Sequence, residues 1–290
     1  MNQPVALTFI DLALDTLAQH AGLLAILADG EAPATPAARK LDRATRGMVA
    51  RAMASADWAK AKPGEALTLA FPAGLAAEVM MLVKLPRKAD AAQARKAGAT
   101  IGRALGAANA LVLAESHAMA AEVSFGLCLR AYEFTAHKSG DQKKRGAVAM
   151  ACAKPESVAA RAQPMAALTE GIFFTRDLVN EPANVLTTDD FAARLAAMQE
   201  LGLEVEILEE AELQKLGMRA LLGVGQGSES PSKVVVMQWK GGKPGEAPFA
   251  LVGKGVCFDT GGISIKPAGG MEDMTMDMGG AAVVAGVMRT

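Results

Sequence analysis

The chain contains 290 residues, well above the roughly 100–150 residues of a common domain, which predicts two domains. Its 30 Lys and Arg residues nearly balance its 31 Asp and Glu residues, so the net charge gives no reason to expect a nucleic acid or an anionic membrane as main partner. Hydrophobic residues make up 51% of the chain and aromatic residues only 4%, which excludes a largely disordered protein and suits helices packed through small side chains.

The N-terminal segment lacks the pattern of a secretion signal. MNQPVALTFIDLALD has no basic flank followed by an uninterrupted apolar run, and no stretch of the chain approaches the roughly 20 apolar residues that cross a bilayer. Cys128, Cys152 and Cys257 lie far apart, each within an apolar run, which indicates buried free thiols in a reducing compartment. We therefore expect a soluble cytoplasmic protein with no membrane partner.

Short apolar runs alternate with helical patterns in the first half of the chain. The runs typical of strands are LLAILAD, LTLAF, AEVMMLVKL and ALVLAE. Helical patterns occur around 39–54 and 91–107; in the second, apolar residues recur every three or four positions on one face, which should pack on a sheet. This alternation predicts an α/β fold.

The second half follows a stretch rich in Pro, Ser and Ala near 155–164. Its pattern predicts a helix to about Leu178, a helix from Asp189, and strands at LEVEILEE, KVVVMQW and FALVGKG. We place the domain boundary at about residue 165, so that 1–165 form a smaller N-terminal α/β domain and 166–290 belong to a mixed-sheet α/β domain.

Two polar or glycine-rich segments give no strong functional signal. LLGVGQGSESPSK precedes a strand instead of following one, so we interpret it as a flexible turn and not as a nucleotide-binding loop. HKSGDQKKRG, at 137–146, is interpreted as a solvated loop, with contact to an anion or a nucleic acid as the alternative.

The informative segment is APFALVGKGVCFDTGGISIKPAGGMEDMTMDMGGAAVVAGVM. Lys254 follows a wholly apolar run and lies between two glycines, and Asp259 ends a second expected strand in CFDTGG. The alternating ISIK places Lys266 just before a proline, and Asp277 lies between a Met-rich loop and a glycine-led helix. Four ionisable side chains are thus expected to be buried in the most apolar part of the chain, where each needs a partner or a metal.

The spacing alone leaves two interpretations open. The four groups can form two buried Lys–Asp salt bridges that stabilise a glycine-rich corner, or the carboxylates can bind Zn²⁺, Mn²⁺ or Mg²⁺. The three histidines all lie outside this segment, and the chain has no His-x-x-x-His, Cys-x-x-Cys or Gly-x-Ser-x-Gly pattern. The metal hypothesis therefore depends on oxygen ligands.

The stretch VGKGVCFDTGGISIKPAGGMEDMTMDMGGAA resembles the metal-binding core of the leucyl aminopeptidase family, cytosolic exopeptidases that use two bridged metal ions. Both lysines, FD-x-GG and DM-x-GA lie at the family spacing. The opening of that family's catalytic domain is similar to RDLVNEPANVLTTDDFA, and the stretch that follows it in the family is similar to GMRALLGVGQGS. A helix of the family's smaller domain is similar to SFGLCLRAYEFTAHKS. The resemblance covers most of the chain, most closely 176–288. It implies a metal-dependent aminopeptidase with a leucine-like preference, acting on peptides.

The same resemblance implies a role for each matching residue. Asp259 bridges two divalent metal ions, Mn²⁺ or Zn²⁺, while Asp277 and the neutral amine of Lys254 bind the more exchangeable one. Lys266 contacts the substrate and stabilises the transition state. Met274 lines the pocket for the first side chain of the substrate, with core packing as the alternative for a Met-rich stretch. The family further implies a homohexamer.

The chain departs from the family pattern in one respect. A later motif of the form NTDAEGR, whose Asp and Glu complete the metal shell and whose Arg helps to bind an anion, does not occur before Thr290. We therefore expect the catalytic domain to be incomplete at Thr290 and the chain to be part of a longer product, since Lys254, Asp259, Lys266 and Asp277 are all retained.

Two other functions stay open as alternatives. A DNA-binding or structural member of the same family, with catalysis secondary or lost, is favoured only by the basic cluster Lys138, Lys143, Lys144 and Arg145. A two-metal phosphoesterase would use similar oxygen ligands, and a comparison of phosphate esters with aminoacyl amides as substrates would distinguish the two enzymes.

Overall fold

The computed structural model describes residues 2–141 and 144–290. Within these residues the chain forms an N-terminal unit, Gln3–Thr169, and a C-terminal unit, Glu170–Thr290 with Asn2. The boundary between the units lies inside α6 (Pro155–Asn180), a continuous helix, and the expected boundary at about 165 falls in the same helix.

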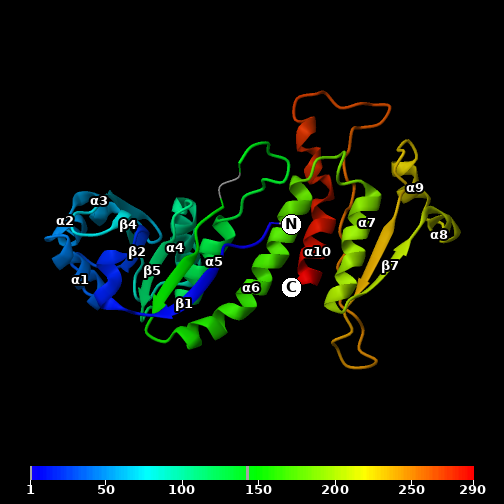
Figure 1. The fold of residues 1–290 in the computed structure, drawn as a ribbon. Helices are drawn as coiled ribbons and strands as arrows, with labels where there is room; N and C mark the ends of the chain where they lie inside the picture. The colour runs from blue at the N-terminus through cyan, green and yellow to red at the C-terminus, as the bar shows by residue number, and fades with distance from the viewer. Residues whose placement is uncertain (1, 142–143) are drawn as a thin grey trace. The chain divides into compact units, whose positions relative to one another are not determined.

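A six-stranded sheet forms the centre of the N-terminal unit (Figure 1). The strand order is β1-β6-β5-β2-β4-β3, and neighbouring strands are parallel except for β3 and β4. The strands are β1 (Leu7–Asp11), β2 (Gly22–Ala28), β3 (Ala66–Ala70), β4 (Ala77–Lys84), β5 (Ala110–Glu115) and β6 (Val148–Cys152). The four expected strands correspond to β2, β3, β4 and β5, which confirms the α/β pattern of this half.

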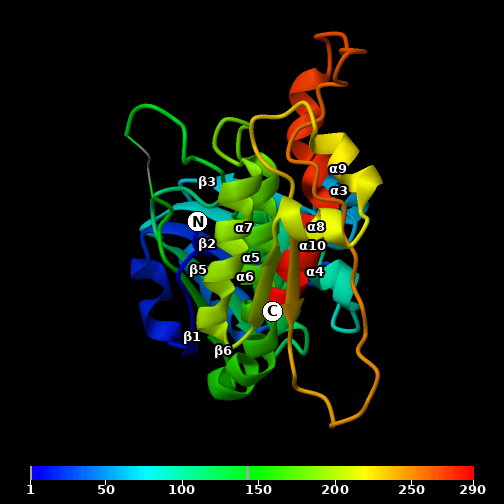
Figure 2. The same cartoon turned by 90° about the vertical axis from the view of Figure 1, so that its right-hand side faces the viewer.

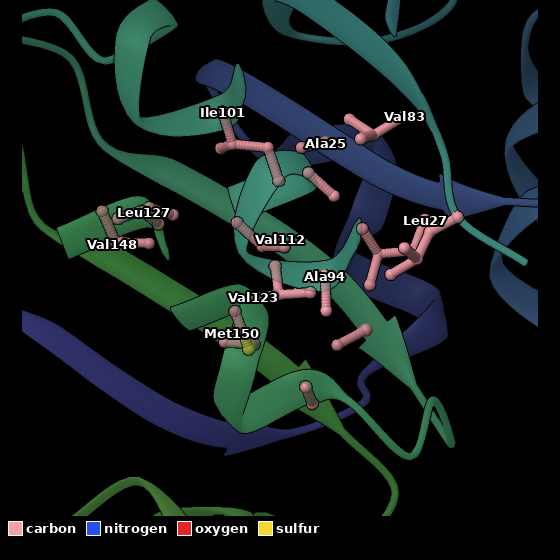
Figure 3. Packing of buried hydrophobic residues seen from close by; sticks show 14 of the residues in the cluster. Ala25, Leu27, Val83, Ala94, Ile101, Val112, Val123, Leu127, Val148 and Met150 are labelled. Atoms are coloured by element: carbon pink, nitrogen blue, oxygen red, sulfur yellow. The ribbon is translucent and has the colours of Figure 1, made fainter. Parts of the chain in front are cut away.

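Side chains of β2 alternate between two hydrophobic clusters, one on each face of the sheet. Leu23, Ala25 and Leu27 belong to the cluster that includes α4 and α5 (Figure 3), whereas Leu24 and Ile26 pack with α1, α2 and α3. These helices are α1 (Pro36–Ala44), α2 (Met48–Met53), α3 (Ala56–Lys60), α4 (Ala91–Ala104) and α5 (Ala120–Arg130). Because helices cover both faces, β2 is buried along its whole length, as is usual in a parallel sheet.

The expected single helix around 39–54 is wrong, because the chain forms α1 and α2 with a break between them. Arg46 and Gly47 have φ angles of 54° and 82°. These left-handed conformations cannot continue a right-handed helix, and Gly47 becomes the N-cap of α2. The helix expected at 91–107 is confirmed as α4, which begins with a capping box between Asp90 and Gln93.

The C-terminal unit packs helices around one hydrophobic cluster. Its elements are α7 (Thr188–Ala196), β7 (Glu204–Leu208), α8 (Glu210–Lys215), α9 (Arg219–Gly225), β8 (Val234–Gln238) and α10 (Gly279–Arg289), with β7 and β8 antiparallel. Phe174 of α6, Phe191 of α7 and Ala282 of α10 share the cluster. Figures 1 and 2 both show α10 alongside α6, where the Thr175 hydroxyl donates a 3.0 Å hydrogen bond to the Ala282 carbonyl.

The strands expected at FALVGKG, before Asp259 and at ISIK are wrong: 239–270 contains neither helix nor strand. A strand needs a neighbour that satisfies its backbone groups, and among the described residues none pairs with this segment. Phe249, Val252 and Ile263 are almost completely exposed. The glycine-rich LLGVGQGSESPSK also differs from expectation in part, since its first residues lie in α9.

Cys128, Cys152 and Cys257 are free thiols, as expected, but only Cys152 is fully buried. Burial raises the pKa of all three to about 11. Among the residues that the structure describes, no helix combines the length and apolar character needed to cross a membrane.

The basic segment at 137–146 is a loop in its described part. Lys138 and Arg145 each form an ion pair with Glu133, at 3.3 Å and 3.5 Å. Lys143 lies outside the described residues. Two of the four basic side chains thus have an acidic neighbour within the chain.

Candidate metal-binding site

Lys254 is held against the first turn of α10 by close backbone contact. The Lys254 carbonyl accepts a 2.8 Å hydrogen bond from the Ala281 amide. A Cβ placed on Gly253 would lie 2.5 Å from the Gly280 carbonyl oxygen, so only glycine allows the two segments to approach this closely. This contact brings Lys254 next to Asp277, which precedes α10 by two residues.

The ammonium of Lys254 forms an ion pair with Oδ1 of Asp277. The Lys254 side chain is 59% exposed and that of Asp277 only 20%. The second oxygen, Oδ2 of Asp277, is buried and has no hydrogen-bond partner among the described residues. A buried carboxylate oxygen without a partner is unfavourable, and a bound cation would satisfy it.

Asp259 and Lys266 are brought together by a tight turn. Gly261 has a φ of +91°, and a Cβ there would lie 2.4 Å from the Ser264 carbonyl oxygen. The Lys266 amide closes the turn with a 2.9 Å hydrogen bond to the Thr260 carbonyl. As a result, the Lys266 ammonium lies 2.7 Å from Oδ2 of Asp259.

The same turn stabilises the charge of Asp259. The hydrogen bond from Lys266 and the 2.9 Å hydrogen bond from the Gly261 amide to Oδ1 together lower the pKa of this carboxyl group, against an opposing effect of burial. The positive charge of Lys254 contributes further. Asp259 is therefore ionised at neutral pH, the form in which a carboxylate binds a metal.

Met274 belongs to the 3-10 helix η3 (Met271–Met278). Its sulfur lies 3.2 Å from the Lys266 ammonium. The methionines of this helix differ in environment. Met278 is fully buried in the core of the C-terminal unit, whereas Met276 is 57% exposed. Core packing therefore applies to Met278, and Met274 instead joins the charged site.

The four ionisable residues form two Lys–Asp pairs, Lys254 with Asp277 and Lys266 with Asp259. This is the pairing of lysines with aspartates that the salt-bridge interpretation of the sequence expects. Their expected burial is wrong for three of them, because only Asp277 is mostly buried. The apolar runs FALV and ISI indicate burial in the sequence, but they lie in the exposed segment without strands. The described residues contain no group of three or more His, Cys, Asp or Glu that could hold a metal. A metal here would use Asp259, Asp277 and the amine of Lys254.

Two backbone amides that shape the site are not among the residues expected from the sequence. The Gly261 amide binds Asp259, and the Ala281 amide binds the Lys254 carbonyl. The signal for these amides in the sequence is the pair of glycines that follows each aspartate, because positive φ angles and close backbone approach require glycine.

The chain matches two family models. The N-terminal domain of the cytosol aminopeptidase family matches residues 25–141, and the catalytic domain of that family matches residues 173–290. Probable cytosol aminopeptidases of Cereibacter sphaeroides and Dinoroseobacter shibae are 64% and 57% identical over 290 residues. These alignments cover 100% of this chain, which spans 59% of the length of each relative.

Solved structures agree with these matches. The bottromycin maturation enzyme BotP in complex with Mn is 29% identical, with a TM-score of 0.67 over 92% of this chain and 55% of that chain. A tomato leucine aminopeptidase mutant is 24% identical, with a TM-score of 0.76 over 99% of this chain and 59% of that chain, and shares the fold. The resemblance in the sequence is confirmed: the chain belongs to the cytosol aminopeptidase family.

Proposed function

We propose that the C-terminal unit contributes part of a two-metal centre to a metal-dependent aminopeptidase, which releases N-terminal residues from peptides with a leucine-like preference. The observation that supports this best is the buried Oδ2 of Asp277, which has no partner within the described residues and lies in the span matched by the catalytic-domain model. The manganese complex of BotP supports a divalent metal.

The proposed ligands are Asp259, Asp277 and Lys254, and the proposed ions are Mn²⁺ or Zn²⁺. Asp259 would bridge the two ions, and its low pKa keeps it ionised for that purpose. Lys254 can ligate only as the neutral amine, so it has to release a proton before it binds. When bound, such ions lower the pKa of a water molecule and polarise the scissile carbonyl.

Lys266 is proposed to act as a fixed cation beside the negative charge that develops on the substrate. Its ammonium is held by Asp259 at 2.7 Å, and its side chain is 34% exposed, so it can still contact a substrate. A positioned cation stabilises developing charge without reorganisation during the reaction. Met274, at 3.2 Å from this ammonium, is proposed to line the pocket for the first substrate side chain.

Further parts of the proposal rest on the family alone. We propose a cytoplasmic homohexamer in which 1–165 form the N-terminal domain and 166–290 belong to the catalytic domain. Sedimentation of the intact protein tests the oligomeric state. The relatives from Cereibacter sphaeroides and Dinoroseobacter shibae are named as probable cytosol aminopeptidases. These names support neither of the two alternative functions, DNA binding and phosphoesterase activity.

Exhaustive chelation of the intact protein tests the proposed function. We expect hydrolysis of an aminoacyl amide such as leucine p-nitroanilide to stop and to return with Mn²⁺ or Zn²⁺, because the ligands bind only when deprotonated. A phosphate ester serves as the control substrate. Full activity after chelation, or hydrolysis of the ester instead of the amide, would contradict the proposal.

A further inference from the structure

The Lys266 ammonium contacts two side chains. A lysine ammonium has three N–H donors. One points to Oδ2 of Asp259 at 2.7 Å, and another contacts the Met274 sulfur at 3.2 Å. These partners come from different parts of the chain, since Asp259 directly precedes the turn that the Lys266 amide closes on Thr260, whereas Met274 belongs to η3. Two contacts leave one donor for a substrate.

The contact to sulfur adds a constraint that Asp259 alone does not give. A single ion pair on a flexible lysine stem allows the ammonium to rotate and slide around the carboxylate. A thioether is a weak acceptor, but it is polarisable and sits at a fixed place when its side chain is packed. Met274 is partly buried, unlike Met276, and can therefore restrict where the ammonium lies.

We propose that Met274 is a positioning residue for Lys266, in addition to any contact with the substrate side chain. This inference rests on the proposed aminopeptidase function. It predicts that Met274→Leu, which keeps the size but removes the sulfur, lowers kcat about tenfold, because a small displacement of a charge-stabilising group is costly. The fall in kcat should occur with all three substrates that begin with Leu, Met or Ala, on top of any change in their ranking that the pocket contact causes. Metal content should stay unchanged.

Met276→Leu is the matched control, because Met276 lies in the same 3-10 helix but is 57% exposed. It should leave kcat unchanged. Melting temperatures of both variants exclude a loss of folding as the cause. If Met274 only lines the pocket, Met274→Leu should change the ranking among the three substrates and leave the best kcat unaltered. That result would overturn the positioning role.

Oxidation by hydrogen peroxide gives a readout that does not depend on activity. Peroxide transfers one oxygen atom to the sulfur, which becomes a sulfoxide while water is released. If the Lys266 ammonium engages the Met274 sulfur, the sulfoxide should form several-fold faster in Lys266→Leu than in the wild type. The rate at Met276, measured by mass spectrometry in the same samples, should not change.

The two measurements separate the possible failures. Equal oxidation rates at Met274 in both proteins, or an unchanged kcat in Met274→Leu, would overturn the inference. Absence of any chelator-sensitive aminopeptidase activity in the wild type would instead reject the proposed function, and the peroxide comparison would still decide whether the contact between Lys266 and Met274 exists.

Discussion

Gly253 and Gly280 approach each other so closely that a Cβ on Gly253 would lie 2.5 Å from the Gly280 carbonyl oxygen. This contact joins the segment that contains Lys254 to the start of α10, and therefore to Asp277. The geometry of the Lys254–Asp277 pair thus depends on a position with no side chain.

Gly253→Ala should separate these two segments. Because the added methyl group meets backbone and not a flexible side chain, we expect a loss of about 1–3 kcal/mol in the free energy of unfolding. Metal affinity should also fall, since Lys254 moves away from Asp277. Gly269→Ala is the control, because a Cβ there has no neighbour within 4 Å. Urea unfolding and metal titration of both variants test this, and equal behaviour would show that the close contact is unimportant.

The side chain of Lys233 is only 10% exposed. The hydrogen bond to Glu209 raises its pKa above the ordinary value of 10.5, and Asp189 at 3.0 Å adds to this effect. A raised pKa in the folded state means that the ion pairs stabilise the protein fully below the unfolded-state pKa. This contribution is lost as the pH rises through the folded-state pKa.

We therefore expect Lys233→Met to lower the melting temperature at pH 7. The variant should also lose less stability than the wild type as the pH rises above 10.5, because it lacks the group whose folded-state pKa lies above that value. Lys240→Met serves as the control, since the Lys240 side chain is 65% exposed and its ion pair with Glu204 contributes little. Parallel melting curves for the Lys233 variant and the wild type at every pH would contradict this.

The thiol of Cys128 should react slowly with iodoacetamide. Burial raises its pKa to about 11, so only about 0.1% is thiolate at pH 8. Unfolding in urea restores the ordinary pKa of 9.0 and should accelerate alkylation about 100-fold, in line with the larger thiolate fraction. Mass spectrometry of the peptide that contains Cys128 measures both rates. Fast alkylation of the folded protein would show that the thiol is exposed.

The fold was predictable where burial alone determines the structure. The apolar run of β2 is buried at all seven positions, and its sequence predicts a strand. FALVGKG has the same character but forms no strand, because hydrogen-bonded pairing depends on a neighbour that local sequence does not specify. β1 lies outside the predicted strands because it is an edge strand with a half-exposed pattern.

The sequence singles out four residues for the candidate site but does not determine how they pair. Spacing and resemblance identify Lys254, Asp259, Lys266 and Asp277. Which lysine meets which aspartate depends on the turn at Gly261 and on the start of α10, and neither follows from spacing. The sequence also predicts burial for both pairs, whereas three of the four side chains are at least one-third exposed. They are exposed because Lys254, Asp259 and Lys266 lie in the segment without helix or strand between β8 and η3.

Substitution of Lys254 and of Lys266 should have different effects. If Lys254 is a metal ligand, Lys254→Ala should lower the affinity for one ion of the pair, and added metal should partly restore the rate. If Lys266 stabilises transition-state charge, Lys266→Ala should keep its metal content and lower kcat by about 10²–10³-fold, the usual loss for one electrostatic stabiliser. Metal stoichiometry and kcat of both variants of the intact protein measure these effects.

The salt-bridge interpretation makes a different prediction for the same two variants. It treats Lys254 and Lys266 alike and expects only a change in stability, with normal rates per folded molecule. Because both lysines are at least one-third exposed, that change should be small, as is usual for ion pairs in contact with solvent. Two variants with full metal content and normal kcat would therefore reject the catalytic assignment. A large fall in kcat for Lys266→Ala, at an unchanged melting temperature, would exclude the purely structural role.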